Sequence, residues 1–272
     1  MRVYAEDGVL ARTIVGHTGG VISLSISESG QLVSGSWDGT FRIWNLDSGE
    51  EIVCSDELEN GISVACLPGG MIASGSTGRK EGGKHVGYHV RLHSADGKEI
   101  KKCQGHSQAV RGVVPMGGDG RFATVSNDGS LIVWGPGGDL EAQWRGSPSG
   151  SEPTFLFCAA YRPAVLPAQA SASASGSASA TSNYDAESNN RSASASGSAD
   201  DAGELACPPL LFCGSDDGTV KVFAASNVAA GPVQALPLSG TPWSIDTLPN
   251  GDVVVGCMQA ASSSKGHAYV FS

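Results

Sequence analysis

The sequence predicts an all-β fold that is built from repeated four-stranded sheets. A unit of about 45 residues recurs along the chain, and its apolar runs are short and rich in Val, Ile, Leu, Phe and Thr. Asp-Gly pairs separate several of these runs, and they favour tight hairpin turns because glycine accepts a positive φ. Glycine makes up 38 of the 272 residues, a content that long helices tolerate badly, so an all-helical bundle is close to excluded.

Two units are nearly complete copies of each other, each with a Gly-His pair, an Asp-Gly turn and a tryptophan. In the first copy these are Gly16-His17, Asp38-Gly39 and Trp44, with strands predicted at residues 21–26, 31–36 and 41–44. In the other they are Gly105-His106, Asp128-Gly129 and Trp134, with strands predicted at residues 110–114, 122–126 and 131–134. His17 and His106 are 89 positions apart, about two periods, so a further unit is expected between them.

Three weaker units complete the series. The second unit has no Gly-His pair, carries His93 in place of tryptophan, and extends one loop with polar and glycine-rich residues 77–89. Its predicted strands are residues 61–67, 71–76 and 90–94. Those of the fourth unit are 154–161, 210–215 and 220–223, and those of the fifth are 243–248, 252–258 and 268–271.

Sheets of this kind stack radially into a β-propeller, because each sheet buries its two faces against its neighbours. The sequence predicts five blades, at about residues 16–58, 59–103, 104–143, 144–235 and 236–272. The last blade lacks a fourth strand. Either the apolar segment 9–15 supplies it and closes a five-bladed ring, or residues 2–4 and 9–15 are outer strands of a preceding blade in an open arc.

Residues 163–209 interrupt the fourth unit between its first and second strands. They include ASASASGSASA and RSASASGSAD, and such small polar residues bury too little apolar area to offset their conformational entropy. The segment is therefore predicted to be a disordered insert. A long insertion is tolerated at a surface hairpin because the entropy of loop closure grows slowly with length.

The recurring polar residues predict a buried hydrogen-bond network rather than a catalytic triad. A catalytic Ser-His-Asp set would occur once, beside an oxyanion site, whereas this set recurs in two units and decays in the others. The predicted members are His17, Ser34 or Ser36, Asp38 and Trp44 in the first unit, and His106, Thr124 or Ser126, Asp128 and Trp134 in the third.

The charge balance of the sequence excludes some classes of binding partner. Seventeen Lys and Arg residues against 27 Asp and Glu residues give a net charge of -10, which has the wrong sign for binding nucleic acid or an anionic membrane. No apolar run approaches the ~20 residues of a membrane span, and the first residues are too polar for a signal peptide. A protein of the cytoplasm or nucleus is expected, with its seven cysteines as free thiols.

The sequence predicts no enzyme, cofactor or metal site. It contains no G-x-S-x-G, G-x-x-x-x-G-K-[ST] or H-E-x-x-H motif. His85, His89 and His93 have a spacing that would place them on one face of a helix. They occupy a glycine-rich loop that leads into a strand, where this spacing does not bring the side chains together.

The Gly-His and Trp landmarks resemble WD repeats in all five units. Three stretches are similar, in this order, to blades of the amino-terminal propeller of the phospholipase A-2-activating protein family, also called the ubiquitin fusion degradation factor family. They are IVGHTGGVISLSISESGQLVSGSWDGTFRIW (14–44), QGHSQAVRGVVPMGGDGRFATVSNDGSLIVW (104–134) and LPLSGTPWSIDTLPNGDVVVG (236–256). The propeller of that family has seven blades, of which this chain matches the later five.

This resemblance implies a non-catalytic propeller that binds ubiquitin and acts in ubiquitin-dependent protein degradation and ubiquitin recycling. It also implies an AAA-type segregase as a partner, bound through domains that this chain does not contain. The alternative is a WD-repeat scaffold for another protein or peptide.

A propeller binds partners mainly where the loops before the inner strands and the Asp-Gly turns converge. Trp and Arg in this region are informative because both are enriched among interface hot spots. The candidate residues follow the Gly-His positions or precede the turn aspartates, and they are Ile22, Trp37, Ser63, Arg111, Asn127, Asp216 and Trp243.

Overall fold

A computed structural model describes residues 1–56, 58–146, 154–164, 208–258 and 266–271. The regular structure in these residues consists of β-strands and two short 3-10 turns, η1 (Pro68–Gly70) and η2 (Val228–Ala230). None of the described segments forms a helix long and apolar enough to cross a membrane. The fold is all-β, as the repeat pattern predicts.

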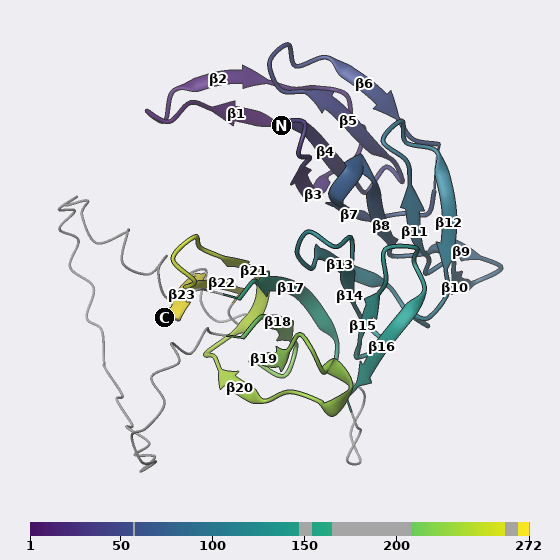
Figure 1. The fold of residues 1–272 in the computed structure, drawn as a ribbon. Helices are drawn as coiled ribbons and strands as arrows, with labels where there is room; N and C mark the ends of the chain where they lie inside the picture. Colours follow the sequence, from purple (N-terminus) through teal and green to yellow (C-terminus); the bar gives the residue numbers. More distant parts are fainter. Residues whose placement is uncertain (57, 147–153, 165–207, 259–265, 272) are drawn as a thin grey trace.

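Five antiparallel sheets follow one another along the chain and lie side by side around a common centre (Figure 1). The first blade consists of β3 (Val21–Ile26), β4 (Gln31–Ser36), β5 (Phe41–Asn45) and β6 (Glu51–Cys54). The second consists of β7 (Ile62–Cys66), β8 (Ile72–Ser76), β11 (Val90–His93) and β12 (Glu99–Cys103). The third consists of β13 (Val110–Pro115), β14 (Phe122–Ser126), β15 (Ser130–Trp134) and β16 (Leu140–Arg145).

The fourth blade consists of β17 (Leu156–Arg162), β18 (Leu210–Ser215), β19 (Thr219–Ala224) and β20 (Gln234–Pro237). The fifth has three strands, β21 (Thr241–Thr247), β22 (Val253–Met258) and β23 (His267–Phe271). In every blade the first strand lies on the concave side of the row of blades (Figure 1). The inner strands β3, β7, β13, β17 and β21 therefore define the surface around the common centre.

Pairing of β17 with β18 places the predicted insert between the first two strands of the fourth blade. Residues 165–207 lie outside the described part of the chain, so the predicted disorder remains a prediction.

A small hairpin occupies the loop of the second blade that the sequence predicts only as a polar extension. Strands β9 (Arg79–Glu81) and β10 (Lys84–Val86) pair antiparallel across Gly82 and Gly83. Both glycines have positive φ, 56° and 80°, which is the conformation that a two-residue hairpin turn needs. The Gly-Gly pair was the available signal for this hairpin.

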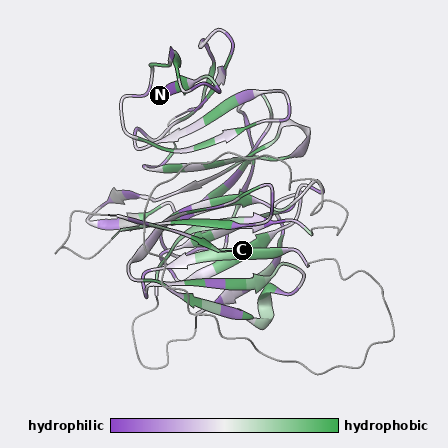
Figure 2. Ribbon diagram, turned by 90° about the vertical axis from the view of Figure 1, so that its left-hand side faces the viewer, coloured by the Kyte–Doolittle hydropathy of each residue, from purple (hydrophilic) through white to green (hydrophobic). Residues whose placement is uncertain are grey.

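The core lies between successive sheets rather than inside any one of them. Phe41 and Ile43 of the first blade, for example, pack with Ile62 and Val64 of the second. In a view turned by 90°, the sheets lie on top of one another, and many residues of their strands are hydrophobic (Figure 2). Removing a Phe or Ile side chain from water stabilises the fold by about 1.5–3 kcal/mol, so the contacts between blades hold the molecule together.

The closed-ring arrangement predicted for residues 9–15 is not the one in the structure. Strand β2 (Leu10–Thr13) pairs with β1 (Arg2–Tyr4) as a separate sheet, and not with β23. The hairpin is held at the first blade because Val3 and the adjoining Ile14 pack against Trp44. The two segments thus pair with each other and not with the last blade.

Candidate partner-binding face

A β-bulge occurs at the same position of the inner strand in four of the five blades. The extra residue, which has no partner on the neighbouring strand, is Ile22 in β3, Arg111 in β13, Phe157 in β17 and Trp243 in β21. A bulge turns its side chain out of the regular alternation of the strand. One residue in each of these four blades is thereby presented beside the common centre.

A second row of side chains comes from the turns between the second and third strands. The backbone N–H groups of Trp37, Asn127 and Asp216 each donate a hydrogen bond to the residue two positions before the bulge, at 2.9, 3.0 and 3.1 Å. In the third blade the two rows meet, because Arg111 Nε donates to Asn127 Oδ1 at 2.9 Å. Each of these blades therefore offers one bulge residue and one turn residue on the same side.

The chemical character of this face changes from blade to blade. Ile22 and Trp37 are 43% and 47% exposed and form an apolar end. Arg111 and Asn127 contribute a half-buried polar pair in the middle, and burial lowers the pKa of the Arg111 guanidinium. At the other end, the rings of Phe157 and Trp243 are stacked at 5.1 Å between centroids, with 9° between their planes.

Trp37 rests on the second blade as well as its own. A Cβ added to Gly61 would lie 2.6 Å from the Trp37 ring and 2.5 Å from Thr77 Oγ1, and Gly61 has a φ of +62°. Only glycine at this position lets the indole approach the backbone so closely. The contact fixes the side chain across the boundary between the two blades.

Ser63 does not belong to this face. It is 5% exposed, and its hydroxyl donates to the carbonyl of Gly75 at 3.2 Å. The prediction is wrong because the second blade has no bulge here: Ile62 pairs with Ser76 and Ser63 pairs with Gly75, in unbroken register. Conversely, Phe157 was not among the predicted residues, since no Gly-His pair marks this position in the fourth unit.

The predicted network is present in the first blade. Trp44 Nε1 donates to Ser34 Oγ at 2.8 Å, Ser34 Oγ lies 2.7 Å from His17 Nε2, and His17 Nδ1 lies 2.7 Å from Asp38 Oδ2. An indole can only donate and a carboxylate can only accept, so the bonds run in one direction from Trp44 to Asp38. His17 is thereby assigned the proton on Nδ1.

The third blade repeats the network. Trp134 Nε1 donates to Thr124 Oγ1 at 2.8 Å, Thr124 Oγ1 lies 2.7 Å from His106 Nε2, and His106 Nδ1 lies 3.3 Å from Asp128 Oδ2. Burial by itself would raise the pKa of Asp128, but the hydrogen bonds that it accepts from His106, Ser130 and the Ser107 backbone outweigh burial, so this pKa is lowered. Such a satisfied buried network rigidifies the blade.

Ser36 and Ser126, which were also predicted as the hydroxyls of the network, have another role. Each accepts a hydrogen bond from the backbone N–H of the turn aspartate, Asp38 at 3.2 Å and Asp128 at 3.1 Å. They shape the Asp-Gly turn and do not contact the histidine ring. Ser34 and Thr124, which do, are fully buried, and each accepts a hydrogen bond from an indole N–H.

In the second blade an ionic cluster replaces the network. His93 stands in the place of the tryptophan and keeps only the bond to Ser74 Oγ, at 2.9 Å. Burial, followed by the charge of Arg91, lowers the pKa of His93 to about 4, so the ring is neutral at physiological pH. Arg91 lies 2.5 Å from a Glu59 oxygen and 2.9 Å from a Glu99 oxygen, and Arg91 and Glu59 are both buried.

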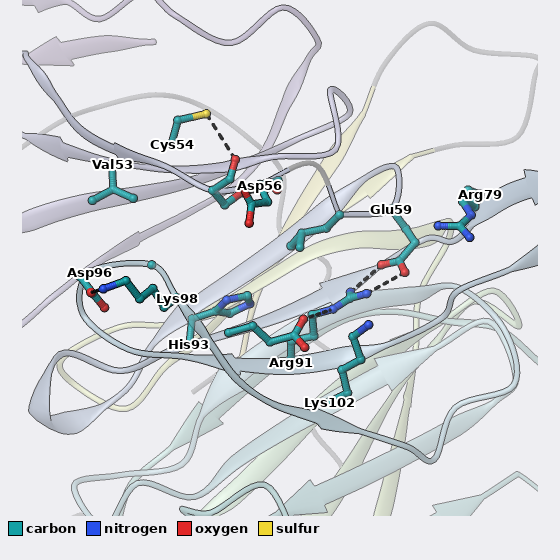
Figure 3. A pocket seen from close by; sticks show the side chains of 14 residues that line it. Val53, Cys54, Asp56, Glu59, Arg79, Arg91, His93, Asp96, Lys98 and Lys102 are labelled. Atoms are coloured by element: carbon teal, nitrogen blue, oxygen red, sulfur yellow. Dashed lines mark hydrogen bonds and ion pairs between the residues drawn. The ribbon is translucent and has the colours of Figure 1, made fainter.

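A cavity of about 540 Å³ opens beside this cluster, between the outer strands of the first two blades (Figure 3). Its charges are largely paired within the protein: Arg91 with Glu59 and Glu99, Lys98 with Asp96 at 2.7 Å, and Arg79 with Glu81 at 3.3 Å. Asp56 and Lys102 also line the cavity, so it carries charges of both signs rather than one sign alone. Within the described residues, no group of three or more His, Cys, Asp or Glu side chains could hold a metal ion.

Radially arranged four-stranded blades, with a Trp-Ser/Thr-His-Asp network in two of them, define a WD-repeat β-propeller. The family model for the WD domain, G-beta repeat, matches residues 8–45 and 97–135. The WD40 β-propeller domain of Doa1, known from a crystal structure, superposes on 90% of this chain with a TM-score of 0.60 and 21% sequence identity.

Sequence relatives match over shorter stretches. Periodic tryptophan protein 2 homolog of Schizosaccharomyces pombe is 51% identical over 49 residues, which are 18% of this chain and 6% of that protein. Striatin-3 of Mus musculus is 40% identical over 81 residues, 27% of this chain and 10% of that protein. The chain thus covers a tenth or less of these relatives and 62% of the Doa1 propeller domain.

Proposed function

We propose that this propeller is a non-catalytic adaptor that binds ubiquitin through the bulge and turn residues Ile22, Trp37, Arg111, Asn127, Phe157, Asp216 and Trp243. The observation that carries the proposal is the row of side chains that the bulges present around the common centre. Its exposed tryptophans and its arginine are residue types that dominate interface energies.

Two further observations support ubiquitin as the partner. The three stretches that resemble the phospholipase A-2-activating protein family include Trp37, Arg111 and Trp243 themselves. The face is also apolar at its Ile22–Trp37 end and belongs to a protein with a net charge of -10, which suits a partner with a hydrophobic patch and a basic rim. In this proposal the adaptor serves ubiquitin-dependent degradation and recycling in the cytoplasm or nucleus, with an AAA-type segregase bound through other domains.

Titration of isotope-labelled ubiquitin with the propeller tests the proposal. We expect binding in the micromolar range, as is usual for a small transient interface. Trp37→Ala and Arg111→Ala should each weaken it by about fivefold or more, which corresponds to about 1 kcal/mol. Ile100→Ala is the matched control, because Ile100 is 58% exposed but lies on the outer strand β12.

Two results would count against this function. Unchanged affinity in both folded variants would place the ubiquitin site elsewhere. Absence of ubiquitin binding would favour the alternative, a WD-repeat scaffold that uses the same face for another protein or peptide.

A further inference from the structure

Three aromatic rings gather where the fourth and fifth blades adjoin. Phe157 and Trp243 are stacked, and the Phe155 ring meets Phe157 edge-on at 6.4 Å and 72°. Trp243 is 50% exposed, so part of this aromatic surface is open to solvent. The face of an aromatic ring carries negative electrostatic potential and attracts cations, tryptophan most strongly.

An acidic residue, Asp216, is joined through its backbone to Phe155, which carries one of these rings. The N–H of Asp216 donates to the carbonyl of Phe155 at 3.1 Å, and Asp216 forms no ion pair within the described residues. The nearby cation, Lys221, instead bonds to Asp217 and Thr219. Burial, followed by the charge of Asp217, raises the pKa of Asp216 against the opposing effects of backbone hydrogen bonds and of the Lys221 charge.

The third blade has a cation at a position where the fourth blade has none. There the bulge residue is itself a cation, Arg111, and its side chain bonds to the turn residue Asn127. In the fourth blade the same two positions hold Phe157 and Asp216, an aromatic ring and a carboxylate. The blade has both groups that would receive a cation but does not supply the cation.

We propose that Phe157, Trp243 and Asp216 form a subsite for a lysine or arginine side chain of the protein partner. This inference rests on the proposed function only in that the same face must bind a protein. The cation would lie over the stacked rings with the Asp216 carboxylate beside it. Desolvation by the rest of the interface would strengthen both contacts.

A small probe tests the subsite without any partner protein. Nα-acetyl-arginine amide is titrated against the labelled propeller, and the Trp243 indole N–H signal is followed, after its assignment as the signal absent from Trp243→Phe. The uncharged analogue Nα-acetyl-citrulline amide has nearly the same shape. We expect the arginine compound to shift the signal saturably in the millimolar range and the citrulline compound to bind at least threefold more weakly.

The variant Asp216→Asn preserves the shape of the turn and should weaken binding of the arginine compound at least threefold. Glu50→Gln is its control, since Glu50 is an exposed acid in the turn between β5 and β6. Equal binding of the two compounds, no shift of the Trp243 signal, or unchanged binding in Asp216→Asn would each overturn the inference. Ubiquitin binding that persists in any of these cases would leave the proposed function standing, so the two failures are distinguishable.

Discussion

At the residue scale, Asp38 is the acceptor on which the first network ends. Its two oxygens receive hydrogen bonds from Thr18 N at 3.0 Å, Thr40 N at 3.0 Å, Thr40 Oγ1 at 2.7 Å and His17 Nδ1 at 2.7 Å. In Asp38→Asn, the amide NH₂ would face one of these donors. We expect a loss of about 1–3 kcal/mol in the free energy of unfolding, measured in urea. Asp47→Asn, in an exposed turn, should change it by less than about 0.5 kcal/mol.

The same carboxylate predicts a dependence of stability on pH. Burial alone would raise its pKa, but the hydrogen bonds from Thr40, His17 and Thr18 outweigh burial and lower it well below the usual 3.8. A depressed folded-state pKa contributes stability above the unfolded value, and this contribution is lost as the pH falls below about 4. The difference in unfolding free energy between wild type and Asp38→Asn should therefore be full at pH 7 and shrink at pH 3. A constant difference would contradict this assignment.

The identity of the network was predictable from recurrence, but the choice of hydroxyl was not. Ser34 and Ser36 are two positions apart, so both lie on one face of β4. Which of them meets the histidine depends on register, in which Trp44 stands opposite Leu32 and so close to Ser34. The register arises only when the strands pair, so the residue types at positions 34 and 36 do not show which serine contacts the histidine.

At the scale of the element, the second blade depends on a buried ion pair. Glu59 precedes β7 and holds Arg91 of β11, and the hydrogen bond and charge of Arg91 lower the pKa of Glu59 against the opposing effect of burial. Glu59→Gln leaves a buried guanidinium with Glu99 as its remaining carboxylate. We expect a loss of about 3 kcal/mol in urea unfolding. Glu81→Gln removes the exposed pair with Arg79 and should cost less than about 1 kcal/mol.

A comparable loss in the two variants would mean that the buried pair is not what holds the second blade. A second readout separates local from global effects. Because Gly61 lies two residues after Glu59 and supports the Trp37 ring, loosening this segment should alter the fluorescence of Trp37 in folded protein. Glu81→Gln should leave that fluorescence unchanged.

Strand positions followed from the sequence because apolar runs bounded by Gly, Asp and Pro are local signals. The bulges did not, since an extra residue in the inner strand leaves the apolar pattern readable on either side of it. Arg111 follows the Gly105-His106 landmark and Trp243 was selected as a tryptophan of the fifth unit, whereas Phe157 has no landmark before it and Ser63 has no bulge. The candidate partner-binding face was thus predictable where a landmark or a tryptophan marks the position, and not at Phe157.

At the scale of the whole molecule, the two ends of the row of blades remain separate. Strand β2 is paired with β1, the last sheet has three strands, and apolar side chains are exposed at both ends, including Leu24 and Ile26 on β3 and Met258 on β22. Closure by residues 9–15 was a reasonable expectation from sequence because a strand can add to any free edge. The contact of Ile14 and Val3 with Trp44, which involves residues distant in sequence, decides the pairing.

Engineered disulfides test this arrangement in solution. Arg2 and Thr13 are paired on neighbouring strands, so Arg2→Cys with Thr13→Cys should crosslink efficiently at low protein concentration. Thr13→Cys with Val270→Cys should not, because β2 and β23 belong to different sheets.

Cys54 is exposed and Cys207 lies outside the described residues, so both are replaced by serine in each variant. The remaining thiols, including the half-buried Cys66, can stay, since burial raises their pKa, to about 12 for Cys158, and suppresses the reactive thiolate. Efficient intramolecular crosslinking of the second pair, with the first pair unreactive, would show that the ring closes through residues 9–15 after all.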